Sequence, residues 1–187
     1  MQPSLLIASP QMRDPNFEKT VVLVWHHDAQ GAIGVVVNRP TGHRLDEVLD
    51  FPLDRSGRDS GRPPDAPIRT DVPVAWGGPV ENGSGTVVTI GAITDDEGWM
   101  LPSGLSVTRS HEALTRLLEE GAPMMLCLGY AGWGPGQLDK EIELGGWLWT
   151  DCDASIVFGT PPDERYDRAL ASLGLQAHQV WMQPVNE

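Results

Sequence analysis

The glycine-rich stretch LGYAGWGPGQ (residues 128–137) is the first candidate for chemistry in this sequence. Glycine loops between a strand and a helix hold phosphates in nucleotide enzymes, because their bare N–H groups can converge on an anion. The spacing of Gly129 and Gly134 fits such a loop, but proline and glycine follow where lysine and a hydroxyl residue are required. A dinucleotide fingerprint fails as well, because Gln137 stands where glycine or alanine is needed. We therefore interpret the stretch as a structural turn and expect no cofactor.

The run His26-His27-Asp28 offers three side chains that could bind a metal ion or move a proton. Neighbouring side chains of an extended chain point to opposite faces, so His26 and His27 are poorly placed to chelate one ion, and no further ligand follows at a zinc-like spacing. No metal site is expected. His26 alone stays a candidate general base, because imidazole titrates near neutral pH.

Asn38-Arg39-Pro40 follows the apolar run IGVVV, at the predicted end of a strand. An amide and a permanently charged guanidinium at that position could bind an anionic group, since loops beside a sheet often carry function. Structural roles compete evenly with this hypothesis. Asn38 can form an Asx turn, and Arg39 can pair with an acidic neighbour.

The other reactive residue types favour structural roles. Cys127 lies inside the apolar run MMLCLG, where a thiol packs as a small hydrophobe and its thiolate is disfavoured. Three carboxylates follow the glycine-rich stretch on a short predicted helix. Asp139 and Glu143 share one face of it and Glu141 does not, so the spacing implies a solvated face and no catalytic pair.

The elements that must position these residues follow from hydrophobic periodicity and end signals. Strands are predicted at 21–25, 33–37, 72–76, 86–90 and 124–128, with a medium-length hairpin loop at 26–32 and a turn at 82–83. Helices are predicted at 45–49, 110–120, 137–144 and 160–174. Two ambiguous segments, 147–150 and 156–158, are assigned to strands. Residues 52–70 are rich in Pro, Gly, Asp and Ser and are expected to form a mobile loop.

Length and charge limit the class of protein. A chain of 187 residues without a long polar linker predicts one domain, 1–187. The formal net charge of -13 opposes contact with nucleic acid and anionic lipid. The first ten residues lack the basic region of a secretion signal, and the two cysteines fit no disulfide framework, so a cytoplasmic protein with no membrane partner is expected.

Three segments give the chain a specific resemblance to the YqgE/AlgH family of bacterial proteins. They are LLIASPQMRDPNFEKTVVLVWHHDAQGAIGVVVNRP (5–40), GGPV (77–80) and LGYAGWGPGQLDKEIELGGWL (128–148). The resemblance implies an α+β fold: a single mixed domain whose bifurcated, partly barrel-like β-sheet is flanked by short helices. It implies no reaction, cofactor or catalytic residue. The family name reflects a proposed role in transcriptional regulation of alginate synthesis.

Two hypotheses for function remain beside direct DNA binding, which the charge disfavours. The first is a non-enzymatic cytoplasmic regulatory or interaction protein that acts indirectly on gene expression through an unidentified protein or small molecule. Its binding surface would comprise Asp14, Asn16, Asn38, Arg39, Trp133 and Gln137. In that surface Trp133 is a candidate recognition anchor, although covering the core is the commoner role of tryptophan. The second is a small hydrolase or lyase with His26 as base, Arg39 holding an anionic group and Gln137 polarising the substrate.

Overall fold

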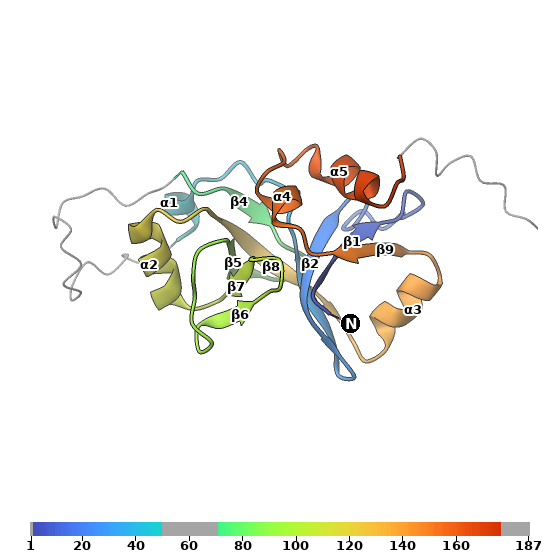
Figure 1. Cartoon of the computed structure of the whole chain (residues 1–187), viewed down its shortest axis with the longest axis horizontal. Coiled ribbons are helices and arrows are strands. Elements are labelled where there is room, and N and C mark those ends of the chain that lie inside the picture. Colours follow the sequence, from blue (N-terminus) through green and yellow to red (C-terminus); the bar gives the residue numbers. More distant parts are fainter. Residues whose placement is uncertain (1, 50–70, 177–187) are drawn as a thin grey trace, which may run out of the picture.

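Strand β8 (Met124–Trp133) connects the two parts of a nine-stranded sheet. In the computed structural model, which describes residues 2–49 and 71–176, the first half of β8 lies between antiparallel β5 (Val80–Thr89) and parallel β4 (Val74–Trp76). The end of β8 leaves these strands and pairs with β3 (Gly31–Val36), so the sheet divides along this strand (Figure 1).

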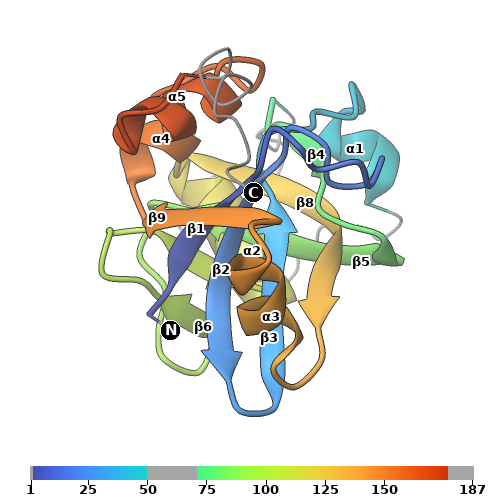
Figure 2. The same cartoon turned by 90° about the vertical axis from the view of Figure 1, so that its right-hand side faces the viewer.

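The second part of the sheet is built on a hairpin of β2 (Val21–Asp28) and β3. Strand β1 (Ser4–Ala8) pairs with β2 on one side and with β9 (Trp147–Asp151) on the other. Figure 2 shows β2 and β3 side by side, with a short helix next to β3. Every β2 residue from 21 to 25 is at most 4% exposed, which confirms that this apolar run is buried on both faces.

Short helices cover the curled sheet. They are α1 (Leu45–Val48), α2 (His111–Glu120), α3 (Gln137–Glu143), α4 (Ala154–Val157) and α5 (Arg165–Ser172). Helix α5 lies against β1 and β2 and contacts α4, whereas α1 and α2 lie at the left-hand end of the molecule and α3 at the right (Figure 1). The α+β class and the bifurcated, partly barrel-like sheet implied by the resemblance are confirmed. No helix within the described ranges is long and apolar enough to cross a membrane.

Alternation along β8 explains how one strand serves two apolar cores. Met125 and Cys127 point into the core around β1, β2 and α5, while Met124 and Leu126 point into the core beneath α2. Successive side chains of a strand face opposite sides, so this strand seals both cores at once. The continuous apolar run MMLCL is the sequence counterpart of that double burial.

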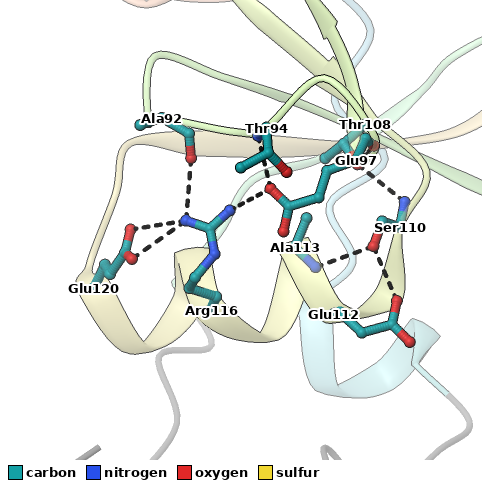
Figure 3. Close-up of polar contacts among 9 residues, drawn as sticks. All are labelled: Ala92, Thr94, Glu97, Thr108, Ser110, Glu112, Ala113, Arg116 and Glu120. Carbon is teal, nitrogen blue, oxygen red and sulfur yellow. Dashed lines mark hydrogen bonds and ion pairs between the residues drawn. The ribbon is translucent and has the colours of Figure 1, made fainter.

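Helix α2 carries the end signals that its sequence predicts. The Ser110 hydroxyl accepts the N–H of Ala113 at 3.2 Å (Figure 3). A cap of this kind satisfies one of the free N–H groups of the first turn. Gly121 ends the helix with a positive φ of 70°. The helix therefore begins and ends within a residue of the predicted bounds.

Arg116 fastens α2 to the segment before β6 (Gly98–Met100). Its guanidinium donates to the Glu97 carboxylate at 2.6 Å, to the Ala92 carbonyl at 3.1 Å and to Glu120 one helical turn on at 3.3 Å (Figure 3). The pKa of Glu97 is lowered, first by the N–H of Thr94 and then by the charge of Arg116. Strand β6 pairs with β7 (Ser106–Thr108), and neither of these short strands is predicted from the sequence.

Four local predictions are wrong. Helix α5 begins at Arg165, five residues after the predicted start at 160. Residues 154–157, which overlap the predicted strand 156–158, form α4, because the Asp153 side chain accepts the N–H of Ser155 and starts a helical turn. Asn82-Gly83 lies inside β5 at a register shift and makes no hairpin turn. The hairpin connection is tight, since β2 and β3 extend to Asp28 and Gly31. The predicted mobile loop, 52–70, lies outside the described residues.

Candidate functional site

The glycine-rich stretch is mostly strand. Strand β8 continues to Trp133, and only residues 134–136 turn the chain into α3. Gly129 has a φ of 72°, and a Cβ there would collide with the carbonyl oxygen of Gly78. Glycine is needed at this position because two backbones approach without room for a side chain. Close packing of two backbone segments therefore explains the glycine at position 129. Gly136, with a φ of 68°, is the N-cap residue of α3.

The segment DPNF (Asp14–Phe17) folds as a turn on the neighbouring surface. The Asp14 carboxylate accepts the N–H of Asn16 at 2.8 Å, and the Asp14 carbonyl accepts the N–H groups of Phe17 and Glu18. Aspartate forms such Asx turns because its short side chain reaches the backbone two residues on. The turn leaves Asp14 exposed and directs Phe17 into a half-buried position.

Arg39 supports this turn from below. Its guanidinium donates to the carbonyls of Asn16 at 2.8 Å, Glu18 at 2.9 Å and Pro15 at 3.2 Å, and it lies 5.2 Å from the ring centroid of Trp76. A planar guanidinium suits this task because its five N–H groups fan out in a fixed plane. The hydrogen-bond donors of Arg39 are thus used by backbone carbonyls of residues 15–18, which belong to the predicted binding surface.

Asn38 has a similar role. Its side-chain oxygen accepts the N–H of Val21 at 2.8 Å, and its amide group donates to the Lys19 carbonyl at 2.9 Å. The amide therefore links the end of β3 to the chain that enters β2. Asn38 and Arg39 could bind an anion or have a structural role, and their contacts in the structure are structural. The partners of Arg39 are backbone carbonyls and not the acidic side chain that was expected.

Three aromatic rings meet where this turn approaches the sheet. Phe17 stacks on Trp133 with centroids 6.3 Å apart and meets Trp147 edge-on at 5.4 Å, and the two indoles lie 5.9 Å apart. Such offset and edge-on pairs are the favourable arrangements of aromatic rings. Trp133 is only 6% exposed, so it covers the core as tryptophan commonly does and presents little free surface of its own.

The Glu141 carboxylate joins the two indoles. One oxygen accepts the Nε1–H groups of Trp133 at 3.0 Å and of Trp147 at 2.9 Å, and the other accepts the side-chain amide of Gln137 at 2.8 Å. The Gln137 oxygen in turn accepts the N–H of Gly134 at 3.0 Å. The spacing of the three carboxylates predicts a solvated face for Glu141, whereas its carboxylate lies against two indoles. The available signal was its spacing of four residues from Gln137, which places both side chains on one side of α3.

These groups border an open cleft of about 370 Å³, called here the aromatic cleft. Its lining residues come from the DPNF turn, the end of β8, α3 and the start of β9: Met12, Asp14, Phe17, Gly132, Trp133, Gln137, Glu141, Leu144, Gly146 and Trp147. Three of the predicted binding residues therefore line one cleft, namely Asp14, Trp133 and Gln137. The other three, Asn16, Asn38 and Arg39, belong to the turn or hold it in place.

His26 lies apart from this cleft. It is half-exposed near the end of the β2–β3 hairpin, where its Nε2 is 3.0 Å from the Asp28 carboxylate. Its neighbour His27 is buried on the other face of β2, with Nε2 3.3 Å from the Asp139 carboxylate of α3. Because Arg39 binds backbone carbonyls and His26 is absent from the cleft lining, only Gln137 of the three proposed catalytic residues borders the cleft.

The cysteine thiols have surroundings unlike those of a nucleophile. Burial raises the pKa of Cys127 to about 12, although the charge of Arg165 opposes the shift. Burial also raises the pKa of Cys152 to about 12, with a further contribution from Asp151. Thiolates do the chemistry of cysteine, so both side chains are inert near neutral pH. Within residues 2–49 and 71–176, no three His, Cys, Asp or Glu side chains cluster as a metal site requires.

A second cleft of about 300 Å³ lies beneath α2, with a mainly aliphatic lining that includes Leu114, Leu126 and Leu128. None of the residues predicted to bind or catalyse borders it. The aromatic cleft is therefore the candidate functional site.

Comparison with known proteins identifies the family. A family model described as AlgH-like matches residues 5–178. A UPF0301 protein of Rhodopseudomonas palustris is 38% identical over 179 residues, which cover 92% of this chain and 80% of that protein. A UPF0301 protein of Thioalkalivibrio sulfidiphilus is 37% identical, over 91% of this chain and 88% of the relative.

Solved structures agree with the sequence matches. The solution structure of the AlgH protein from Pseudomonas aeruginosa superposes with a TM-score of 0.73 at 34% identity, and the match covers 99% of this chain and 95% of that one. A crystal structure of a protein from Corynebacterium diphtheriae shares the fold, with a TM-score of 0.69 at 21% identity over 98% of this chain and 87% of that one. UPF0301 denotes a family of uncharacterised function, and the curled sheet with its few short helices is the shared architecture. The chain belongs to the AlgH-like family.

Proposed function

We propose that this chain is a non-enzymatic interaction protein that binds its partner at the aromatic cleft. The observation that carries the proposal is the convergence of three segments distant in sequence, the DPNF turn, the end of β8 and α3, on one open cleft. Binding sites are typically concave, mostly apolar and furnished with a few fixed polar groups. The aromatic cleft has this composition, and its volume lies within the usual range for such sites, about 300–1,000 Å³.

The chemistry of the lining favours binding over catalysis. No Ser, Cys, His, Lys or Tyr side chain is among the lining residues, so the two carboxylates of the cleft are the only side chains there of a type that enzymes use as nucleophiles. Of its two carboxylates, Glu141 accepts three hydrogen bonds that fix the aromatic walls, and Asp14 closes its own turn. The alternative hydrolase or lyase has no comparable support, because His26 and Arg39 are engaged elsewhere.

An effect on gene expression would pass through a bound protein. The formal net charge of -13 repels the phosphates of DNA, and affinity for DNA depends mainly on neutralising them. Both cysteines are free thiols, which suits the reducing cytoplasm. We therefore place the protein in the cytoplasm, with a protein partner.

The test uses a change at the rim of the cleft that spares the core. Leu144 is 76% exposed and lines the cleft, so Leu144→Arg alters the site without removing buried surface. Met100→Arg is the matched control, because Met100 is 57% exposed on β6 and does not line the cleft. Tagged proteins carrying each change are returned to cells of the source organism, and their co-purifying proteins are compared by mass spectrometry.

We expect one or more partners to disappear with Leu144→Arg and to persist with Met100→Arg. Equal partner lists for both variants and the parent protein would refute the proposal. Salt-sensitive binding of duplex DNA by the purified protein would instead support the direct DNA-binding alternative.

A further inference from the structure

The ionisable groups that border the aromatic cleft are all acidic. Asp14 and Glu141 line it, and Lys, Arg and His do not occur among the lining residues. A cleft with one sign of charge and low-dielectric walls attracts ligands of the opposite sign. The charge of the lining therefore points to a positively charged occupant, and the net charge of -13 strengthens that preference at longer range.

The charge of Glu141 is fixed in place without being cancelled. Its three donors, two indole N–H groups and the Gln137 amide, are neutral. Glu141 forms no ion pair in the described parts of the chain. An ionised carboxylate offers about four lone-pair positions, so three donors leave roughly one free for a ligand. A carboxylate held this way is preorganised to meet a cation.

The walls of the cleft suit the rest of a basic side chain. Aromatic rings attract cations through their electron-rich faces. Of the three rings that border the cleft, Phe17 is half-buried, whereas Trp133 and Trp147 are only 6% and 2% exposed, so Phe17 is the ring with surface to offer a cation. Met12 and Leu144 add aliphatic surface, against which the methylene stem of lysine or arginine can pack. A free metal ion would gain nothing from these apolar groups, because hard cations prefer a shell of oxygen ligands.

We infer that the aromatic cleft receives a lysine or arginine side chain of a partner protein, with the charged head at Glu141 and the stem against Leu144 and Met12. The inference deepens the proposed function and rests on it. The cleft is open to solvent, and a side chain carried by a larger partner can enter it from outside. The exposed apolar rim at Leu144 gives the partner a second contact beside the basic group.

The experiment follows the indole N–H signals of Trp133 and Trp147 in proton–nitrogen correlation spectra. Both N–H groups donate to Glu141, so both signals report on that carboxylate. The probes are capped Gly-Arg-Gly, Gly-Lys-Gly and Gly-Glu-Gly peptides, a peptide with citrulline as the neutral isostere of arginine, and free arginine. We expect saturable shifts with the two basic peptides and none with citrulline.

Variants of the protein test the assigned carboxylate. Glu141→Gln keeps an oxygen for the indoles and removes the charge, and it should weaken binding of the arginine peptide about tenfold, as loss of a charge-assisted contact does. Glu143→Gln is the matched control on the same helix, since Glu143 is exposed and does not line the cleft. Asp14→Asn, whose amide oxygen can still close the turn, is a second test of charge and should also weaken binding.

Besides an absence of shifts with the basic peptides, four outcomes overturn the inference. Equal binding of citrulline and arginine peptides would show that charge is not recognised, and binding of a glutamate peptide would show an anion site. Equal weakening of peptide binding by Glu141→Gln and Glu143→Gln would show that the peptide responds to the overall negative charge and not to the Glu141 carboxylate. Free arginine binding as tightly as the peptides would indicate a small-molecule ligand.

The two proposals fail separately. If Leu144→Arg removes cellular partners while basic peptides do not bind, the interaction site stands and the basic side chain is wrong. If Leu144→Arg removes no partner and the peptides do not bind, both proposals are wrong.

Discussion

Replacing Arg39 tests the role that the structure assigns to it. Its guanidinium holds the DPNF turn through carbonyls of Pro15, Asn16 and Glu18, and it lies over Trp76. If this is its task, Arg39→Ala should loosen the turn and release Phe17 from the aromatic cleft. If Arg39 instead serves as a receptor for an anionic ligand, its removal should leave the turn intact.

The contacts give the size of the effect. Hydrogen bonds within reach of water contribute about 0.5–1 kcal/mol each, and an exposed cation–π contact contributes about 0.5–1 kcal/mol. Three such bonds and one ring contact predict that Arg39→Ala lowers the free energy of unfolding by about 2–4 kcal/mol. Arg39→Lys keeps the charge but lacks the planar set of donors, so it should lose most of the same free energy.

Urea unfolding followed by tryptophan fluorescence measures the change in stability, with Arg13→Ala as control. Arg13 is exposed just before the same turn, so its removal makes the same change in net charge without the three bonds. The local consequence is read from cross-relaxation between the Phe17 ring and the Trp133 indole, which stack in the parent protein. This contact should weaken in Arg39→Ala and persist in Arg13→Ala.

If the free energy of unfolding of Arg39→Ala lies within about 0.5 kcal/mol of that of Arg13→Ala, the range of ordinary surface substitutions, Arg39 does not hold the turn. An unchanged contact between Phe17 and Trp133 would refute this role of Arg39 independently. A variant that kept its stability but lost binding of anions would restore the receptor hypothesis.

Two further predictions concern the centre of the sheet. Gly129→Ala should lower the free energy of unfolding by at least about 2 kcal/mol, since it strains a left-handed backbone and drives a Cβ into the Gly78 carbonyl, whereas Gly83→Ala, in open space, should change it little; urea unfolding checks both. Cys127 should resist iodoacetamide in the folded protein, as judged by mass spectrometry. Folding raises the pKa of the Cys127 thiol from 9.0 to about 12, so the unfolded chain ionises this thiol at a lower pH than the folded protein. The free energy of unfolding should therefore be unaffected by this thiol below pH 9.0 and should fall between pH 9.0 and 12. Cys127→Ala should reduce that pH dependence.

The sequence was sufficient to predict those helices and strands whose apolar pattern and end signals lie within the element itself. Helix α2 has its cap, its apolar stripe and its terminal glycine inside one short segment. Strands β2 and β3 are β-branched runs long enough to exclude other interpretations. In each case the local preference and the tertiary environment agree, which is the condition under which pattern is reliable.

Elements decided by distant partners were missed. The strands β6 and β7 have three residues each, which is too few for a periodic pattern. They are strands because β7 pairs with β5 and β6 pairs with β7. Asn82-Gly83 has the composition of a hairpin turn, yet both flanking parts of β5 pair with β8. Sequence proximity therefore suggested a turn where the fold places an irregular strand.

The candidate site shows the same division. Its segments were identified from residue type, but the roles within them depend on contacts that span the chain. Glu141 receives one indole from β8 and another from β9, and Arg39 reaches carbonyls more than twenty positions earlier. Neither set of partners has a periodicity that could reveal it. Residue type indicated the segments of the candidate site, and only the fold could show which contacts each side chain makes.

The glycine-rich stretch shows how fold and cleft depend on each other. Trp133 lines the cleft with its side chain while its backbone pairs with Ala32 of β3, so the register of the sheet determines which face receives the indole. A slip of one residue would turn that side chain to the opposite face. The opposite wall, the DPNF turn, has no place in the sheet and depends on Arg39. The cleft thus has one wall fixed by strand pairing and one held by the side chains of Arg39 and Asn38, which makes the turn the part of the site most free to adjust to a partner.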